Sequence, residues 1–228
     1  MGKQWARQEL KRNELADRVE NVAITVQANQ QAAMAIAGGV VAVAVIAVGV
    51  WLHLSKSRNE AWEKLAIAQS MAYSGQAKQA LEQLQPVTDG SSIPSAYAQL
   101  FAADVRFKTG EYKEAAAGYQ KLIDRGSPKS LVPVAMADLG LALEASGDCK
   151  GAIEANQRLL DTFQDHFMAP QAQASMVRCY AATGQPTQAK STLDRIVLLY
   201  PESYWAQWAK ERLNPAPAPA AAPVKKTP

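Results

Sequence analysis

Residues 109–116 read TGEYKEAA, and this octamer has three relatives elsewhere in the chain. They are SGQAKQAL (74–81), SGDCKGAI (146–153) and TGQPTQAK (183–190). All four share a Ser or Thr, then a Gly, four variable residues and an Ala. The successive glycines lie 35, 37 and 37 residues apart. A fixed period in this range is typical of a chain built from structural repeats.

Each octamer lies between two segments whose apolar residues have helical spacing. In one unit these segments are AMADLGLALEA (135–145) and KGAIEANQRLLDTF (150–163). The glycine can adopt the left-handed backbone conformation in which one helix ends and the next begins. The alanine suits a point where two antiparallel helices approach closely. The octamer is therefore predicted to be the corner of a helix–turn–helix unit and not a catalytic or ligand-binding loop.

This repeat resembles the tetratricopeptide repeat (TPR) family. Small or short side chains stand at the matching position of each first helix, namely Ala68, Ala103, Gly140 and Val177. The aromatics Tyr112 and Tyr119 and the closing Pro201 also match the family pattern, whereas Ala77, Cys149 and Pro186 replace the aromatic of the turn. The resemblance covers residues 61–201 and implies an all-α fold, a solenoid of about four helix-turn-helix repeats.

The stretch ESYWAQWAKERL (202–213) is predicted to form one more amphipathic helix. Tyr204, Trp205 and Trp208 would cover the open end of the solenoid, because repeat arrays need such a cap. The alternative is an aromatic patch on which a partner docks.

The composition agrees with an all-α fold. The chain has 228 residues, of which 48% are hydrophobic but only 7% aromatic, and alanine is abundant. Alanine costs no side-chain entropy in a helix. Residues 55–214 hold seventeen basic and seventeen acidic residues, interspersed. Nucleic-acid binding requires a clustered basic face, so this balance argues against a nucleic-acid partner.

A long apolar run precedes the repeats. Residues 32–52 read AAMAIAGGVVAVAVIAVGVWL, and no charged residue occurs from Asn21 to Ser55. A helix of this length crosses a hydrocarbon core of roughly 30 Å. A core helix normally carries polar residues on one side, and a cleavable signal peptide has a shorter apolar region followed by a cleavage site. A retained transmembrane helix over 32–54 is therefore predicted.

The charges on either side of this span set its expected orientation. Residues 1–31 hold five Lys or Arg, against three in the first residues after the span. The positive-inside bias then predicts a cytoplasmic N-terminus and a periplasmic C-terminal domain, with the single span in a bacterial inner membrane.

The two ends of the chain complete the predicted domain organisation. Leu15, Val19, Val22 and Val26 form an apolar stripe, so 1–31 is expected to be a cytoplasmic amphipathic helix. It would lie on lipid headgroups or bind a partner helix. The TPR domain is placed at 55–213. The tail, 214–228, has five prolines and is expected to be disordered.

No residue pattern indicates an enzyme. His166 lies near Asp161 and Asp165, but this spacing matches no metal-ligand pattern and no second histidine is close in sequence. Phosphate loops, nucleophile elbows and zinc-protease motifs do not occur in the sequence. Catalytic residues, metals and cofactors are therefore not expected.

The two cysteines, Cys149 and Cys179, lie in helices that should pack against each other. In an oxidising compartment they could form a disulfide, and the alternative is that both are small buried apolar residues.

The TPR resemblance implies that partners bind the concave face lined by the first helices. The implied positions are Trp62, Leu65, Gln69, Tyr97, Leu100, Asp104, Lys108, Ala137, Asp138, Gln171, Ala174 and Arg178. No basic clamp for a terminal carboxylate stands out among them, so the bound peptide is unspecified.

An N-terminal anchor followed by a degenerate TPR domain resembles the ancillary SecYEG translocon subunit family, the YfgM-like proteins. That resemblance implies an inner-membrane scaffold whose periplasmic TPR domain contacts translocon subunits and a membrane-anchored periplasmic chaperone related to prolyl isomerases. Two other functions stay open at this point. One is an envelope scaffold like the periplasmic TPR protein of the Tol–Pal system, and the other is an organelle import receptor with cytosolic TPRs.

Overall fold

The computed structural model describes residues 19–20 and 29–214. The predicted amphipathic helix at 1–31 and the tail at 214–228 lie almost wholly outside these residues. All regular secondary structure within the described ranges is helical, which confirms the predicted all-α fold class. The chain divides between residues 57 and 58 into two units, each described by itself.

The apolar run lies in the first long helix, α2 (Gln30–Tyr73), which has 44 residues. An 18-residue window of this helix has a mean hydropathy of 2.5, and none of the window is buried inside the protein. A core helix of a water-soluble domain would be mostly buried. By length and composition α2 is therefore a candidate membrane span.

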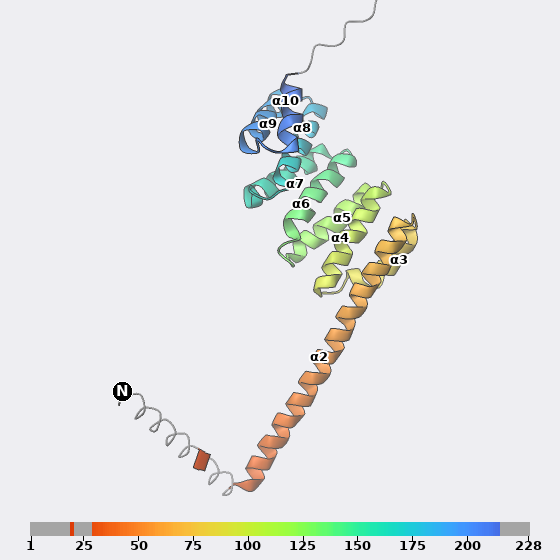
Figure 1. Cartoon of the computed structure of the whole chain (residues 1–228), viewed down its shortest axis with the longest axis vertical. Helices are drawn as coiled ribbons and strands as arrows, with labels where there is room; N and C mark the ends of the chain where they lie inside the picture. Colours follow the sequence, from red (N-terminus) through yellow and green to blue (C-terminus); the bar gives the residue numbers. More distant parts are fainter. Residues whose placement is uncertain (1–18, 21–28, 215–228) are drawn as a thin grey trace, which may run out of the picture. The chain divides into compact units, whose positions relative to one another are not determined.

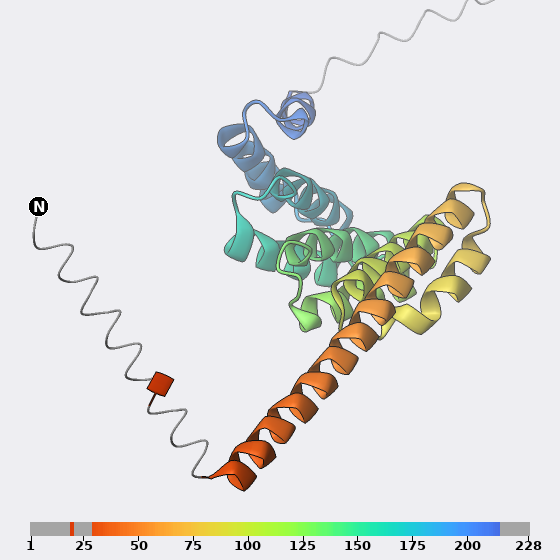
Figure 2. The ribbon, with the colours of Figure 1, turned by 60° about the horizontal axis from the view of Figure 1, so that its bottom comes forward.

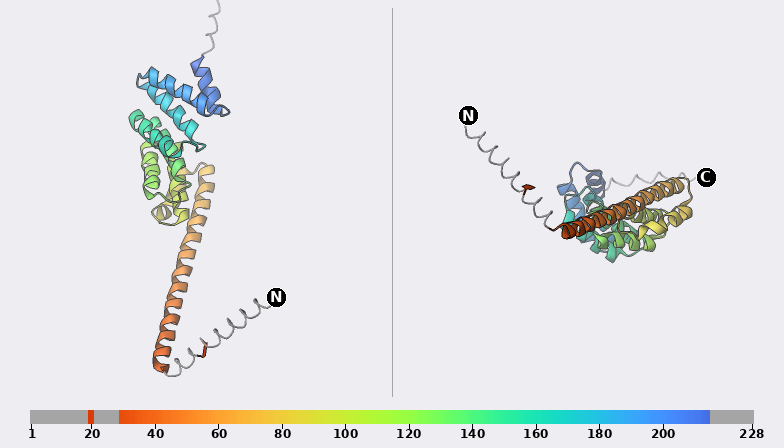
Figure 3. Two further views of the ribbon diagram at one scale, coloured as in Figure 1. Left: turned by 90° about the vertical axis from the view of Figure 1, so that its left-hand side faces the viewer. Right: turned by 90° about the horizontal axis from the view of Figure 1, so that it is seen from below.

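Eight further helices follow in the second unit, together with the last turns of α2 (Figure 1). They are α3 (Ala77–Thr88), α4 (Ile93–Lys108), α5 (Tyr112–Arg125), α6 (Val132–Ala145), α7 (Cys149–Phe163), α8 (Ala169–Ala182), α9 (Pro186–Leu199) and α10 (Tyr204–Leu213). From α3 onward, each helix packs on the next one in the sequence. In addition α6 contacts α8, and α8 contacts α10. The first helices α6 and α8 are thus neighbours, and the helix pairs stack as a solenoid (Figures 2 and 3).

The four recurring octamers are the corners between paired helices, as predicted. Gly75, Gly110, Gly147 and Gly184 all have positive φ, between 71° and 86°. The amide that follows each of them donates a hydrogen bond to the carbonyl five residues earlier, at 2.8–2.9 Å. This is the bond that ends a helix when a left-handed residue follows it. The glycines are therefore required by the backbone and not by a ligand.

The alanines of the octamers lie between the helices that each corner joins. Ala80, Ala115 and Ala152 are fully buried, and Ala189 nearly so. Larger core side chains fill the space further along the pairs, and the largest fully buried aliphatic ones are Leu84, Leu122, Leu159 and Ile196. The core is therefore a seam of successive clusters along the array and not one central cluster.

The last helix caps the solenoid through two of the three predicted aromatics. Trp205 and Trp208 pack on the cluster around Val177 and Ile196. Tyr204 was expected to join them but is 72% exposed. It lies two positions before the buried Ala206, and residues two apart point to nearly opposite sides of a helix.

Candidate protein-interaction surface

The first helices of the repeats carry all twelve positions implied by the TPR pattern, in α2, α4, α6 and α8. Nine of them reach the surface: Trp62, Gln69, Tyr97, Leu100, Asp104, Lys108, Asp138, Gln171 and Arg178. We call these nine the first-helix face. Leu65, Ala137 and Ala174 are instead buried in the hydrophobic seam.

An aromatic pair lies at the N-terminal end of the first-helix face. The ring centroids of Trp62 on α2 and Tyr97 on α4 are 5.5 Å apart, with an interplanar angle of 41°. The two residues are 42% and 36% exposed. Large aromatic side chains that are fixed by each other yet open to solvent are common anchors of protein interfaces.

Two carboxyl groups follow on the same face. The Tyr119 hydroxyl, from α5, donates a 2.7 Å hydrogen bond to Oδ1 of Asp104 on α4. Burial raises the pKa of Asp104, although the Tyr119 bond and the nearby Lys108 lower it. Burial and the Asp104 charge raise the pKa of Asp138, on α6, to about 7. Burial, with Asp104 and then Asp138 nearby, also raises the pKa of Tyr119.

Lys108 is the one cation that acts on Asp104, and neither Asp104 nor Asp138 forms an ion pair within the described residues. Two half-buried carboxyls near one another disfavour each other's ionisation, and a positive charge placed between them would reverse that effect. The sequence placed Asp104 and Asp138 on one face but gave no sign of the Tyr119 hydrogen bond to Asp104. That bond depends on the second helix α5 packing on the first helix α4.

Arg178 is not free to bind a partner's carboxylate. Its Nε and Nη2 atoms donate to the two oxygens of Glu144 at 2.5 and 2.8 Å. Ser175 donates to the same carboxylate at 2.6 Å. A bidentate pair with an added hydroxyl satisfies both charges, so this group links α6 to α8 structurally.

Cys149 and Cys179 lie next to each other as free thiols. Cys179 is buried and Cys149 is half-buried. Burial and the hydrogen bond with Cys149 raise the pKa of Cys179. The disulfide stays a prediction, and Cys149 is the thiol that would react first.

His166, which the sequence suggested as a possible metal ligand, forms a hydrogen bond within its own turn. Nδ1 of His166 accepts a 3.3 Å hydrogen bond from the amide of Met168, which lies in the turn before α8. Across the described part of the chain, no group of three or more His, Cys, Asp or Glu residues is placed to hold a metal ion.

Family models identify the repeats. Two models described as tetratricopeptide repeat match residues 65–130 and 143–213, which together make up more than half of the chain. The chain is a TPR protein. No curated protein matches the sequence.

Solved TPR structures share the fold at low sequence identity. A Podosopora anserina protein with nearly identical TPR-like repeats is 17% identical, with a TM-score of 0.55 over 66% of this chain and 82% of that one. A TPR protein from Parabacteroides merdae is 15% identical, with a TM-score of 0.56 over 68% and 59%. MamA is 21% identical, with a TM-score of 0.52 over 73% and 83%.

Proposed function

We propose that this TPR protein is a membrane-anchored scaffold that binds other proteins through its first-helix face. The observation that carries the proposal is the exposed Trp62–Tyr97 pair on the helices that line this face. Repeat solenoids present such extended surfaces to partners.

The face also favours a particular partner chemistry. On α4, Tyr97, Leu100 and Asp104 are spaced by three and four residues, so they lie along one side of the helix. An extended or helical partner segment can therefore place an apolar side chain on the aromatic pair and a basic side chain near the two carboxyls. The basic group would be stabilised because it relieves the repulsion between Asp104 and Asp138.

We further propose that residues 32–54 anchor the protein in a bacterial inner membrane, with the N-terminus in the cytoplasm and the TPR domain in the periplasm. The unburied apolar window of α2 supports the anchor. The larger number of Lys and Arg residues before the span supports this orientation. A fusion of alkaline phosphatase after residue 213 should be active. A fusion at the same place of a fluorescent protein that matures only in the cytoplasm should not fluoresce. The reverse pattern would place the TPRs in the cytosol and favour an import receptor.

Within that compartment, the partners we propose are Sec translocon subunits and a membrane-anchored periplasmic chaperone. The support is the architecture of one anchor followed by TPRs, which resembles the ancillary translocon subunits. Affinity purification in mild detergent after crosslinking should recover translocon and chaperone subunits. The Trp62→Ala variant should recover several-fold less of them, because it removes half of the aromatic anchor. Recovery of Tol–Pal components instead would indicate the division scaffold.

A further inference from the structure

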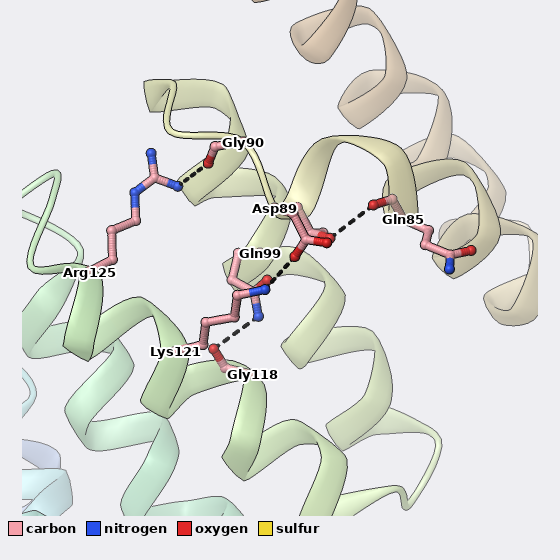
Figure 4. A network of polar contacts seen from close by, with 8 residues as sticks. Gln85, Asp89, Gly90, Gln99, Gly118, Lys121 and Arg125 are labelled. Carbon is pink, nitrogen blue, oxygen red and sulfur yellow. Dashed lines mark hydrogen bonds and ion pairs between the residues drawn. The ribbon is translucent and has the colours of Figure 1, made fainter.

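Among the described residues, no second helix follows the first helix α10. Inside the array, such a helix makes two contacts. The Phe107 ring at the end of α4 meets the Tyr112 ring of α5 edge-on, with centroids 5.3 Å apart. Arg125, at the end of α5, donates to the carbonyls of Gly90 at 2.8 Å and Ser92 at 2.6 Å, in the connection before α4 (Figure 4). Neither contact has a counterpart at α10 within the described structure.

The helix α10 instead carries aromatic rings along its length. The ring centroids of Tyr204 and Trp205 are 5.3 Å apart, and those of Trp205 and Trp208 are 5.6 Å apart, with interplanar angles of 75° and 77°. The Arg212 guanidinium lies 4.0 Å from the centroid of the Trp208 ring, one turn further along the helix. Tyr204 is largely exposed, and both tryptophans are half-buried. We call Tyr204, Trp205 and Trp208 the aromatic row.

An open groove of about 690 Å³ lies at the C-terminal end of α10. Pro186 and Leu193 of α9 and Leu213 of α10 give it apolar walls. Lys190 and Arg212 also line it, and neither forms an ion pair within the described structure. Because Arg212 borders both the groove and the Trp208 ring, the groove continues the aromatic row. A segment that covers this surface should be apolar and carry no positive charge at the groove.

The sequence that follows α10 has this chemistry. Residues 215–223 read PAPAPAAAP and are uncharged. Proline alternating with alanine favours the extended polyproline II conformation, which has no internal hydrogen bonds and which aromatic-lined grooves bind. Polyproline II rises about 3.1 Å per residue, so nine residues span about 28 Å. The ten residues of α10 make a helix of only about 15 Å, so the segment is long enough to reverse at the groove and pass Tyr204.

The charges beyond this segment set its direction. The only charged side chains of 215–228 are Lys225 and Lys226. The groove, lined by Lys190 and Arg212, would repel them. Glu202, at the opposite end of the aromatic row, is exposed and has no ion pair within the described structure. A segment that runs from the groove toward Tyr204 therefore brings its lysines to a carboxylate.

We propose that residues 215–223 fold back along α10 and cover the groove and the aromatic row of their own chain. The prolines and alanines pack on the three rings, in the place where an inner repeat has its second helix. The covalent link favours this segment over the same segment of another molecule, because it gives an effective concentration on the order of millimolar. The surface shares no residue with the first-helix face.

The test uses the full-length protein in detergent micelles, with Trp5, Trp51 and Trp62 replaced by Phe. Acrylamide quenching of its fluorescence then reports Trp205 and Trp208. The matched control also has the four prolines of 215–223 replaced by serine, which keeps the length and charge of the tail. We expect about twofold stronger quenching in the control, because its tail no longer covers the rings.

Two outcomes of this experiment would overturn the proposal. One is equal quenching of the two proteins. The other is protection of the tryptophans that increases with protein concentration, which would assign the segment to a second copy of the chain.

A second measurement locates the segment on α10, by fluorescence anisotropy of a labelled peptide of residues 215–228. Protein truncated after Asn214 should bind this peptide saturably, and full-length protein about tenfold more weakly, because its own tail occupies the surface. Tyr204→Ala should weaken binding to the truncated protein several-fold. Lys210→Gln, an exposed position on the opposite side of α10, should not weaken it. Equal binding by the truncated and full-length proteins, or binding unchanged by Tyr204→Ala, contradicts the proposal.

Discussion

Replacing Asp138 with Asn should stabilise the repeat unit above pH 7 and change its stability little at pH 4. Burial first, and the Asp104 charge second, raise the pKa of Asp138 from its ordinary 3.8 to about 7. Between these two values the folded chain binds a proton that the unfolded chain has lost. Stability therefore falls as the pH rises from about 4 to about 7, and the whole penalty is present above pH 7.

The size of the effect follows from the pKa. At about 1.4 kcal/mol per pKa unit, the rise from 3.8 to about 7 corresponds to about 4 kcal/mol. The carboxyl is only half-buried, so solvent screens part of this penalty, and we expect a gain of about 2–4 kcal/mol at pH 8. Asparagine is close to the protonated carboxyl in size and retains a hydrogen-bonding amide, so little should change at pH 4.

The assay is urea unfolding of the full-length protein in detergent micelles, followed by circular dichroism at pH 4 and at pH 8. The control is Asp194→Asn, which removes a solvent-exposed carboxylate from α9. For each variant, the change that the substitution causes in the free energy of unfolding is measured at pH 8 and at pH 4, and the second value is subtracted from the first. A value near zero for Asp138→Asn, or the same value as for Asp194→Asn, would refute the reasoning.

Three further predictions concern packing, corners and thiols. Gly140→Ala should lower the unfolding free energy by about 1–3 kcal/mol, because its Cβ would lie 2.2 Å from Oδ1 of the buried Asn156. Thermal melts should show the loss largely relieved in an Asn156→Ala background. Gly110→Ala should cost about 1 kcal/mol despite open space around it, since φ is +85°, and equal melting temperatures would contradict this. In native protein, maleimide should label Cys149 much faster than Cys179, whose pKa burial raises, and mild oxidation should join the two thiols unless either is replaced by Ser.

The repeat architecture could be predicted because its signal is local and recurs. A corner needs a left-handed residue, and only glycine adopts that conformation at low cost, so Gly75, Gly110, Gly147 and Gly184 mark the phase of the array. Once the phase is known, helix periodicity gives the face on which each side chain lies. The placement of Trp62 and Tyr97 at the surface follows from that periodicity.

Details that depend on neighbouring repeats could not be predicted in this way. Ala137 and Ala174 lie on the predicted helices but are buried by different neighbours. Ala137 belongs to the cluster that includes Ala172 of α8, and Ala174 to the cluster that includes Leu193 of α9 and Ala209 of α10. The Arg178 guanidinium donates to the Glu144 carboxylate, which lies 34 residues earlier in the sequence. The buried Oε1 atom of Gln173 has no hydrogen-bond partner within the described structure, whereas Gln99, also eleven residues before a corner glycine, donates to the Gly118 carbonyl. The sequence does not distinguish these two positions.

The most direct test of the scaffold function is site-specific photo-crosslinking of the full-length protein in intact cells. A benzophenone amino acid would replace Tyr97 on the first-helix face, and in a matched protein Glu154, which is exposed on the second helix α7. The account predicts discrete crosslinked species from position 97 that are lost when Trp62 is also changed to Ala, and few from position 154. Two results would contradict the claim that the first-helix face binds partners. One is equal crosslinking from both positions, and the other is crosslinking from position 97 that is unchanged by Trp62→Ala.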